Sequence, residues 1–245
     1  MKKRALALAA LLALWGTLSA LMDNALFPGP FAVGAEFAKE LGRGGLGLHL
    51  GISLGRVAAA VCAAFFPALA LGILAGMRRS IDNLVSPAVY VLFPVPKVAL
   101  LPVIMLFLGM GNLSKIFLVA LIVFFQFYLN IRDEAAGINP GYFDSLKSLG
   151  GNGKDCVFHI ILPTLLPRIL SSLRLTLGTA IAVLFLAETF ATRTGIGWYI
   201  MDAWAQLDYD RMYAGIAALS LGGLLLFGLV DAAEWYGCGW RRMRR

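Results

Sequence analysis

The side chains best suited to chemistry in this sequence are a few charged residues inside long apolar stretches. Glu188, Arg174 and Arg56 are of this kind, and an ionisable group inside a membrane span is costly enough to suggest a function. Glu188 fits a gate near an outer mouth and equally a structural hydrogen bond to the following loop. Arg174 could gate a pathway or snorkel to the cytoplasmic interface. Arg56 could attract an anion in a central cavity, pair with an acidic neighbour or lie at the outer headgroups.

No motif for catalysis or nucleotide binding accompanies these residues. The sequence lacks a Gly-x4-Gly-Lys-Ser/Thr loop, a paired His/Glu helix motif and a nucleophile elbow. Cys62, Cys156 and Cys238 have no metal-ligand spacing, so they are interpreted as small buried hydrophobes. We therefore expect a non-catalytic chain without a cofactor or metal of its own.

A polar segment, residues 131–163, is the second candidate for function. Residues 142–149 have a helical period that places Phe143, Leu146 and Leu149 on one face. A short rigid helix of this kind is suited to receiving mechanical work from another protein.

The same segment contains its own stop signals. Gly150 and Gly151 predict the end of that helix, because glycine adopts positive φ angles easily. A second helical stretch over residues 153–161 then leads to Leu162 and Pro163, and proline is favoured in the first turn of a helix.

Composition places these candidates in a membrane protein. The 245 residues are 60% hydrophobic and only 14% charged, whereas roughly a quarter of the residues in a soluble domain are charged. The net charge of +7 could suggest nucleic acid as a partner. The basic residues are scattered between apolar spans, however, so membrane orientation explains them better and no nucleic acid is expected.

Six apolar segments predict an all-α, polytopic fold with about six transmembrane helices, since each is close to or above the roughly 20 residues that span a bilayer. The spans are expected at residues 5–22, 47–77, 84–109, 114–130, 164–190 and 213–238. The third contains Pro94, Pro96 and Pro102, which remove backbone donors and favour a kink or a break.

Basic residues in the connections lie mostly on one side of these spans, which predicts that both termini are cytoplasmic. Residues 1–22 also fit a secretory signal peptide, but their apolar run is long for one and we expect it to be retained as the first span. The outer segments 23–46 and 191–212 contain aromatic residues that suit an interfacial belt or contact with a solute.

The spacing of the polar segment resembles the loop by which permease subunits of ABC importers bind their ATPases. Gly150 precedes Leu162 and Pro163 at the distance typical of that family. Counted from this glycine, the family's Glu-Ala-Ala falls on residues 144–146, where the carboxylate is kept as aspartate and the alanines are not. The letters Glu-Ala-Ala-Gly occur at residues 134–137, ten residues too early, so we follow the spacing.

Other segments resemble the nitrate/sulfonate/taurine-type branch of this family. Residues 92–102, followed by Gly109 and Gly111, are similar to the third-helix signature of the branch. Residues 195–198 (Gly-Ile-Gly-Trp) and Trp240 match it as well.

The resemblance implies a type I ABC-importer permease architecture. Its expected division is an N-terminal helix and outer loop at 1–46, a permease core at 47–240 and a basic tail at 241–245. The implied function is import of a small anionic solute, similar to a sulfonate, taurine or nitrate, across the bacterial inner membrane. Two alternatives stay open: an ion-coupled secondary transporter, and ABC import of a neutral or heterocyclic solute such as a pyrimidine.

The implied partners are a periplasmic or lipid-anchored binding protein, a second permease copy, membrane lipid and a cytoplasmic ATPase that holds ATP and Mg. The residues that would dock on the ATPase are Phe143, Asp144, Ser145, Leu146, Lys147, Gly150, Gly151, Leu162 and Pro163. The candidate pathway residues are Arg56, Pro94, Pro96, Arg174 and Glu188.

Overall fold

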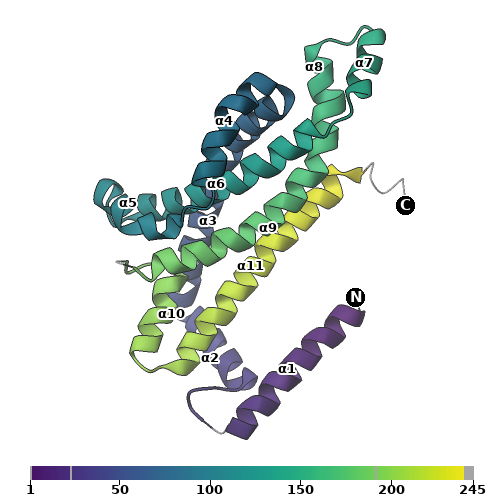
Figure 1. The fold of residues 1–245 in the computed structure, drawn as a ribbon. Coiled ribbons are helices and arrows are strands. Elements are labelled where there is room, and N and C mark those ends of the chain that lie inside the picture. The colour runs from purple at the N-terminus through teal and green to yellow at the C-terminus, as the bar shows by residue number, and fades with distance from the viewer. Residues whose placement is uncertain (1, 23, 191, 240–245) are drawn as a thin grey trace. The chain divides into compact units, whose positions relative to one another are not determined.

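The computed structural model describes residues 2–22, 24–190 and 192–239, and it shows no β-strand in them (Figure 1). Trp240 and the basic tail lie outside the described residues. The helices are α1 (Lys2–Met22), α2 (Pro30–Gly42), α3 (Gly45–Met77), α4 (Arg79–Leu92), η1 (Lys97–Leu100), α5 (Leu101–Leu108), α6 (Asn112–Ala136), α7 (Pro140–Ser148), α8 (Gly153–Cys156), η2 (Val157–Ile161), α9 (Leu162–Glu188), α10 (Ile196–Ala205) and α11 (Tyr209–Gly237).

The expected all-α membrane fold is confirmed, and four helical segments are long and apolar enough to cross a bilayer. They are Gly45–Met77, Asn112–Ala136, Gly153–Glu188 and Tyr209–Gly237. A fifth candidate is α4 together with η1 and α5, which pass the same test as a pair. The apolar helix Ala9–Met22 is shorter than these. The described residues therefore provide four or five of the roughly six spans expected.

The third expected span is broken, as its prolines predicted. The helix pair Arg79–Leu92 and Lys97–Leu108 is bent by 81°, and Pro94 and Pro96 lie in the connection between them. Proline has no N–H to donate and its ring clashes with the preceding turn, so two prolines in this interval end α4.

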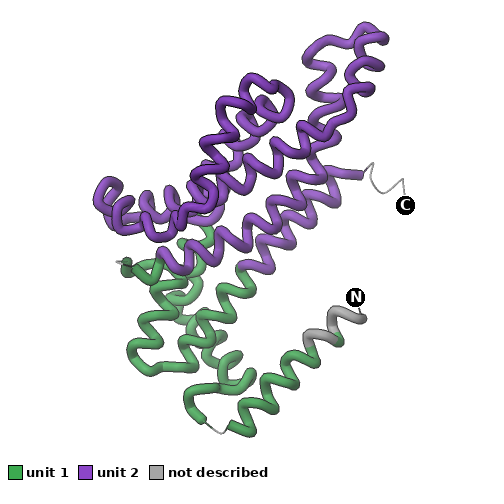
Figure 2. The backbone as a smooth tube through the Cα atoms, in the orientation of Figure 1, with its two compact units in different colours: residues 1–55, 188–222 green, residues 56–187, 223–245 purple. Residues whose placement is uncertain are grey.

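The chain packs into two compact units (Figure 2). Unit 1 comprises residues 1–55 and 188–222, and unit 2 comprises residues 56–187 and 223–245. These units follow from which residues pack together, and the three-part division expected from the sequence stays a prediction.

Unit 2 is built on a close approach of α3 to α6. A Cβ atom at Gly76 would lie 2.6 Å from Ala135 Cβ and 2.6 Å from the Arg132 carbonyl oxygen. One turn earlier, a Cβ at Gly72 would lie 3.0 Å from Ile131 Cβ. Small residues allow helix backbones to approach in a membrane, where packing rather than apolar burial drives association. The two glycines thus set the spacing of the two helices.

We expect Gly76→Val to destabilise unit 2, because the new side chain has no space beside α6. The expected loss is about 1–3 kcal/mol, the usual cost of forcing extra methyl groups into a packed interface. Thermal unfolding of the detergent-purified protein measures it. Gly228→Val in α11 is the matched control, since a Cβ there meets nothing within 4 Å. Equal melting temperatures for the two variants would refute the packing argument.

Candidate functional site

The polar segment forms a helical elbow made of α7, α8 and the turn between them, residues 139–156, at one tip of unit 2 (Figure 2). α7 begins earlier than predicted because Asn139 and Pro140 make a start signal. The Asn139 side chain accepts a hydrogen bond from the Gly141 N–H at 2.8 Å, and Pro140 occupies the first turn. An asparagine cap followed by proline is a typical N-terminus.

The predicted glycine stop after α7 is confirmed. Gly150 has a φ of +80°, and its N–H donates to the Lys147 carbonyl at 2.9 Å. The Gly151 N–H donates to the Leu146 carbonyl at 3.0 Å. These two bonds form a Schellman motif, which satisfies the last carbonyls of the helix. Gly151 is needed for space, since a Cβ there would lie 2.6 Å from Leu146 Cγ.

A capping box that the sequence analysis missed begins the second arm. The Asn152 side chain accepts hydrogen bonds from the Lys154 and Asp155 N–H groups, and the Asp155 carboxylate accepts one from the Asn152 N–H at 2.8 Å. Asparagine three residues before an acidic residue is the signal that could have revealed it. Both arms of the elbow are therefore fixed at the turn that joins them.

The second arm continues directly into the membrane-spanning helix α9, with no separate helix start between them. α8, η2 and α9 form one helical segment, Gly153–Glu188. Pro163 is in the first turn of α9, as predicted, but the helix already runs from Gly153. The π-type turn η2 precedes it, and the Leu162 N–H donates to the Val157 carbonyl. A local widening of this kind is a known way to accommodate a disturbed backbone ladder.

The predicted apolar face of α7 divides into two parts. Phe143 and Leu146 are half-buried against the core of unit 2, whereas Leu149 is 85% exposed. Tyr142 and Phe158 are also exposed. Phe143 and Leu146 therefore anchor the elbow to its own unit, and the exposed apolar surface lies beside them.

The polar residues of α7 lie on its outer side. Asp144, Ser145 and Lys147 are exposed. The Ser145 hydroxyl donates to the Gly141 carbonyl at 2.8 Å, within its own helix. The Glu-Ala-Ala-Gly letters at 134–137 instead lie at the end of α6. Docking of the elbow on a partner stays a prediction.

Glu188 is fully buried in unit 1, where it ties the end of α9 to α3 and to the first turn of α10. Both of its carboxylate oxygens lie 2.8 Å from the Ser53 hydroxyl, and one accepts a hydrogen bond from the Gly197 N–H at 2.9 Å. The same hydroxyl accepts from the Ile196 N–H at 2.8 Å. These contacts are of the structural kind considered for Glu188, and the gate role stays a prediction.

The close approach to Glu188 requires a glycine at Gly195. Its φ is +109°, and a Cβ there would lie 2.3 Å from the Glu188 carboxyl carbon. The Gly195 N–H donates to His49 Nδ1 at 3.1 Å. Ser53 and His49 had no visible signal in the sequence, because their partners lie far along the chain.

The two arginines considered for the pathway have partners in unit 2. Arg174 bridges α9 to α11 by ion pairs with Asp231 and with Glu234, the latter at 3.0 Å. Neither the snorkelling nor the gating interpretation anticipated this bridge. Arg56 is buried and donates to the Asn112 side-chain oxygen at 2.6 and 3.0 Å. The role of Arg56 in a pathway stays a prediction.

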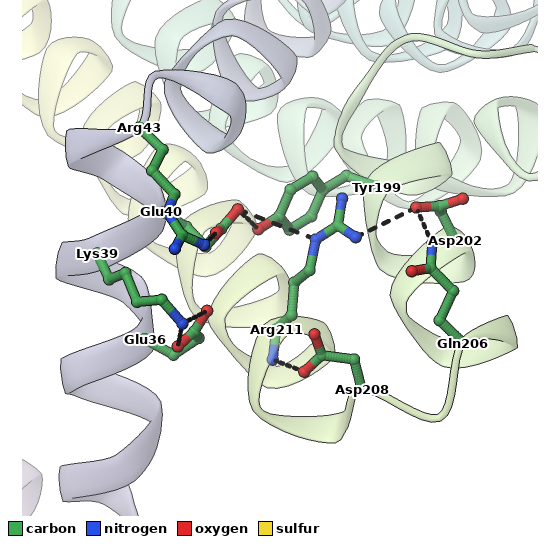
Figure 3. Close-up of polar contacts among 9 residues, drawn as sticks. All are labelled: Glu36, Lys39, Glu40, Arg43, Tyr199, Asp202, Gln206, Asp208 and Arg211. Carbon is green, nitrogen blue, oxygen red and sulfur yellow. Dashed lines mark hydrogen bonds and ion pairs between the residues drawn. The ribbon is translucent and has the colours of Figure 1, made fainter.

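A polar network that the sequence analysis also missed joins α2 to α10 and α11 in unit 1 (Figure 3). The Tyr199 hydroxyl donates to Glu40 at 2.9 Å. The Arg211 guanidinium lies 4.6 Å from the centre of the Tyr199 ring and 3.3 Å from an Asp202 oxygen. Arg43 binds the other Glu40 oxygen at 3.1 Å. The predicted interfacial aromatics of this region thus include a hydrogen-bond donor within an ionic cluster.

The electrostatics of the network favour a charged Glu40 and a neutral Tyr199. Burial acts to raise the pKa of Glu40, but the hydrogen bonds from Tyr199 and Arg43 and the charge of Arg211 outweigh it and lower that pKa. Burial, aided by the hydrogen bond to Glu40, raises the pKa of Tyr199 to about 12. Tyr199 therefore remains a donor at all ordinary pH values.

This network predicts an acid-sensitive part of the stability. The folded-state pKa of Glu40 is below its unfolded value, so its contribution is present at neutral pH and is lost as the pH falls through the lowered pKa. Glu40→Gln should reduce the stability at pH 7 by about 1–3 kcal/mol, and the difference from wild type should shrink towards pH 3. Melting temperatures across this range test it.

Glu36→Gln is the control for that experiment. Glu36 pairs with Lys39 on the same helix at 2.7 Å, and the Lys39 side chain is half exposed, so its ion pair is worth little. A difference between Glu40→Gln and wild type that stays constant with pH would contradict the assignment.

Comparison with known proteins identifies the family of this chain. Residues 68–234 match the family described as "Binding-protein-dependent transport system inner membrane component". The putative aliphatic sulfonates transport permease protein SsuC of Bacillus subtilis is 31% identical over 235 residues, covering 95% of this chain and 85% of that protein. The taurine transport system permease protein TauC of Escherichia coli is 31% identical over 226 residues, covering 89% and 82%.

A solved structure has the same fold. It is a MetNI methionine ABC transporter in inward-facing conformations, which aligns with a TM-score of 0.66 at 16% identity and covers 75% of this chain and 92% of that one. The expected type I permease architecture is thus confirmed, and an ion-coupled secondary transporter is not favoured. The chain belongs to the binding-protein-dependent permeases, the non-catalytic membrane subunits of ABC importers, in their nitrate/sulfonate/taurine branch.

Proposed function

We propose that this permease imports a small organic or inorganic anion, with a sulfonate such as taurine as the first candidate. The support for this solute class is the pair of relatives named for aliphatic sulfonates and for taurine, each aligned over most of its length. In this proposal a periplasmic or lipid-anchored binding protein delivers the solute to the outer face. Selectivity then lies largely in that protein.

The observation that carries the mechanism is the α7–α8 elbow. Its exposed outer side, with Tyr142, Asp144, Lys147 and Leu149, would dock on a cytoplasmic ATPase that holds ATP and Mg. Phe143 and Leu146 would carry the motion inward, because they are packed against the core of unit 2. Because both arms are capped at the turn, the elbow would move as one piece in this proposal.

The proposed assembly contains two permease copies, each bound to one ATPase, with the termini of both copies in the cytoplasm. Closure of the ATPase pair on ATP would draw the two elbows together and turn the pathway outward. Hydrolysis would separate them and turn it inward. This is a rigid-body alternation between two states, which needs no chemistry in the permease itself.

Reconstitution tests the transport function. The permease and its ATPase are reconstituted in proteoliposomes, with the binding protein and the solute outside. The vesicles should accumulate radiolabelled taurine or an alkanesulfonate only when ATP is present on the side of the membrane that holds the ATPase. Nitrate and a formylated aminopyrimidine serve as competing solutes. Uptake that survives without ATP but collapses with the proton gradient would refute the mechanism. Preferred uptake of the pyrimidine would refute the anion assignment.

The docking surface is tested by two matched glycine substitutions. Gly150→Val should abolish co-purification of the ATPase without preventing membrane insertion, because Gly150 needs a positive φ that valine adopts poorly. Gly153→Val is the control, since Gly153 has space for a side chain and lies three residues away. Detergent pull-down quantifies both. Normal ATPase recovery with Gly150→Val would count against the elbow as the contact.

A further inference from the structure

The break between α4 and η1 leaves backbone carbonyls without their usual helical donors. In a continuous helix the Leu92 carbonyl would accept from the N–H of residue 96, but Pro96 has none, and the carbonyl accepts instead a long bond from the Val95 N–H at 3.3 Å. In an apolar environment an unpaired carbonyl costs several kcal/mol. A further donor at these carbonyls would therefore stabilise the break.

Lys97 provides that donor by folding back over the break. Its ammonium nitrogen lies 2.8 Å from the Leu92 oxygen, 2.9 Å from the Phe93 oxygen and 3.5 Å from the Val95 oxygen. The same nitrogen lies 4.4 Å from the centre of the Phe125 ring on α6. The residue is only 9% exposed. One side chain thus binds the end of α4 and attaches the break to α6.

The charge of Lys97 is compensated in an unusual way. Among the described residues, no carboxylate forms an ion pair with it; its partners are carbonyl dipoles and aromatic rings. Burying a charge without a counter-ion is costly, and ionisable groups within membrane spans are functional candidates for that reason. A group used only to fill space would not need to be cationic.

The next break in unit 2 has the same arrangement. Lys115, near the start of α6, lies 3.0 Å from the Met110 oxygen and 3.2 Å from the Gly111 oxygen, five and four residues back. Lys97 binds carbonyls at the same two offsets. The segment η1–α5 thus has a lysine that binds backbone carbonyls at each of its ends. This repeated contact indicates that the position of the segment is fixed at both breaks.

We propose that Lys97 is a positioning residue for solute passage, which keeps α4 and η1 as a discontinuous membrane segment. Discontinuous helices, with free carbonyls held at fixed positions, are a recurring device at the solute sites of transporters. The inference rests on the proposed transport function, because it assigns this break to the solute pathway. Without the ammonium, α4 would change its angle to α5. ATP would then be hydrolysed with less solute moved per ATP.

The functional test compares Lys97→Met with Lys97→Arg in the reconstituted importer, using radiolabelled taurine as the probe. Lys97→Met should assemble and hydrolyse ATP normally but move at least about tenfold less taurine per ATP, as expected from losing a charge-assisted contact. Lys97→Arg should recover most of that ratio, because it keeps the charge and the donors. A ratio within twofold of wild type for Lys97→Met would overturn the proposal, as would equal losses for both variants.

Lys39→Met is the control for removing one positive charge. Lys39 is on α2, with its side chain half exposed and paired with Glu36, so this variant should keep the wild-type ratio. An equal loss for it would show that net charge rather than the break is responsible.

A spectroscopic measurement tests the same inference without transport. Spin labels at Leu84→Cys on α4 and Leu106→Cys on α5, both strongly exposed, report the distance across the break in a background without native cysteines. Lys97→Met should shift or broaden that distance distribution, and Lys97→Arg should not. An unchanged distribution with Lys97→Met would overturn the proposal. Where Lys97→Met is not recovered as a complex, Lys97→Gln takes its place with the same expected result.

The two tests separate the two claims. Absence of ATP-dependent uptake in the wild-type importer for every solute tried would refute the proposed function and leave the distance measurement to decide on Lys97. Wild-type uptake together with an unaffected Lys97→Met would refute only the role of Lys97.

Discussion

Every backbone N–H and C=O group in an apolar environment has to find a partner, and this requirement organises the chain. A continuous helix such as α6, which contains no proline, satisfies it internally. The informative places are those where a helix is interrupted. Two of them are closed by specific residues: Lys97 at the end of α4, and Gly150 with Gly151 in the exposed turn at the end of α7.

Two of these interruptions serve opposite mechanical purposes in the proposed transport cycle. The α7–α8 elbow is capped on both sides of its turn, by a Schellman motif and by the Asn152–Asp155 capping box. It is therefore suited to pass on a force. At the α4–η1 break, where Pro94 and Pro96 end the helix, a single buried ammonium binds the carbonyls. In the role proposed for Lys97, such a contact would hold one helix geometry, and its loss would change the angle between the arms.

The intramembrane charges acquire different meanings once their partners are known. Considered singly, Glu188 and Arg174 were candidates for a gate. In the structure Glu188 accepts hydrogen bonds from Ser53 and from the Gly197 N–H in the first turn of α10, and Arg174 binds Asp231 and Glu234. These partners hold helices together, which is itself a condition for rigid-body motion.

The sequence by itself determined the features that depend on neighbours along the chain. Apolar length predicted the membrane helices, Pro94 and Pro96 predicted the break, and Gly150 predicted the end of α7. The spacing from Gly150 to Leu162 and Pro163 indicated the permease family. Each of these is a local rule, since backbone donors, φ angles and helical period are set within a few residues.

Only the tertiary structure decided which distant groups meet. Tyr199 with Glu40, Ser53 with Glu188 and Arg174 with Asp231 are pairs from remote parts of the chain. Their chemistry is visible in the sequence, but any acid could in principle pair with any donor. The choice is made by helix packing, as at Gly76, where the absence of a single Cβ brings α3 against α6. Such close approaches depend on the shape of both surfaces, which local pattern does not encode.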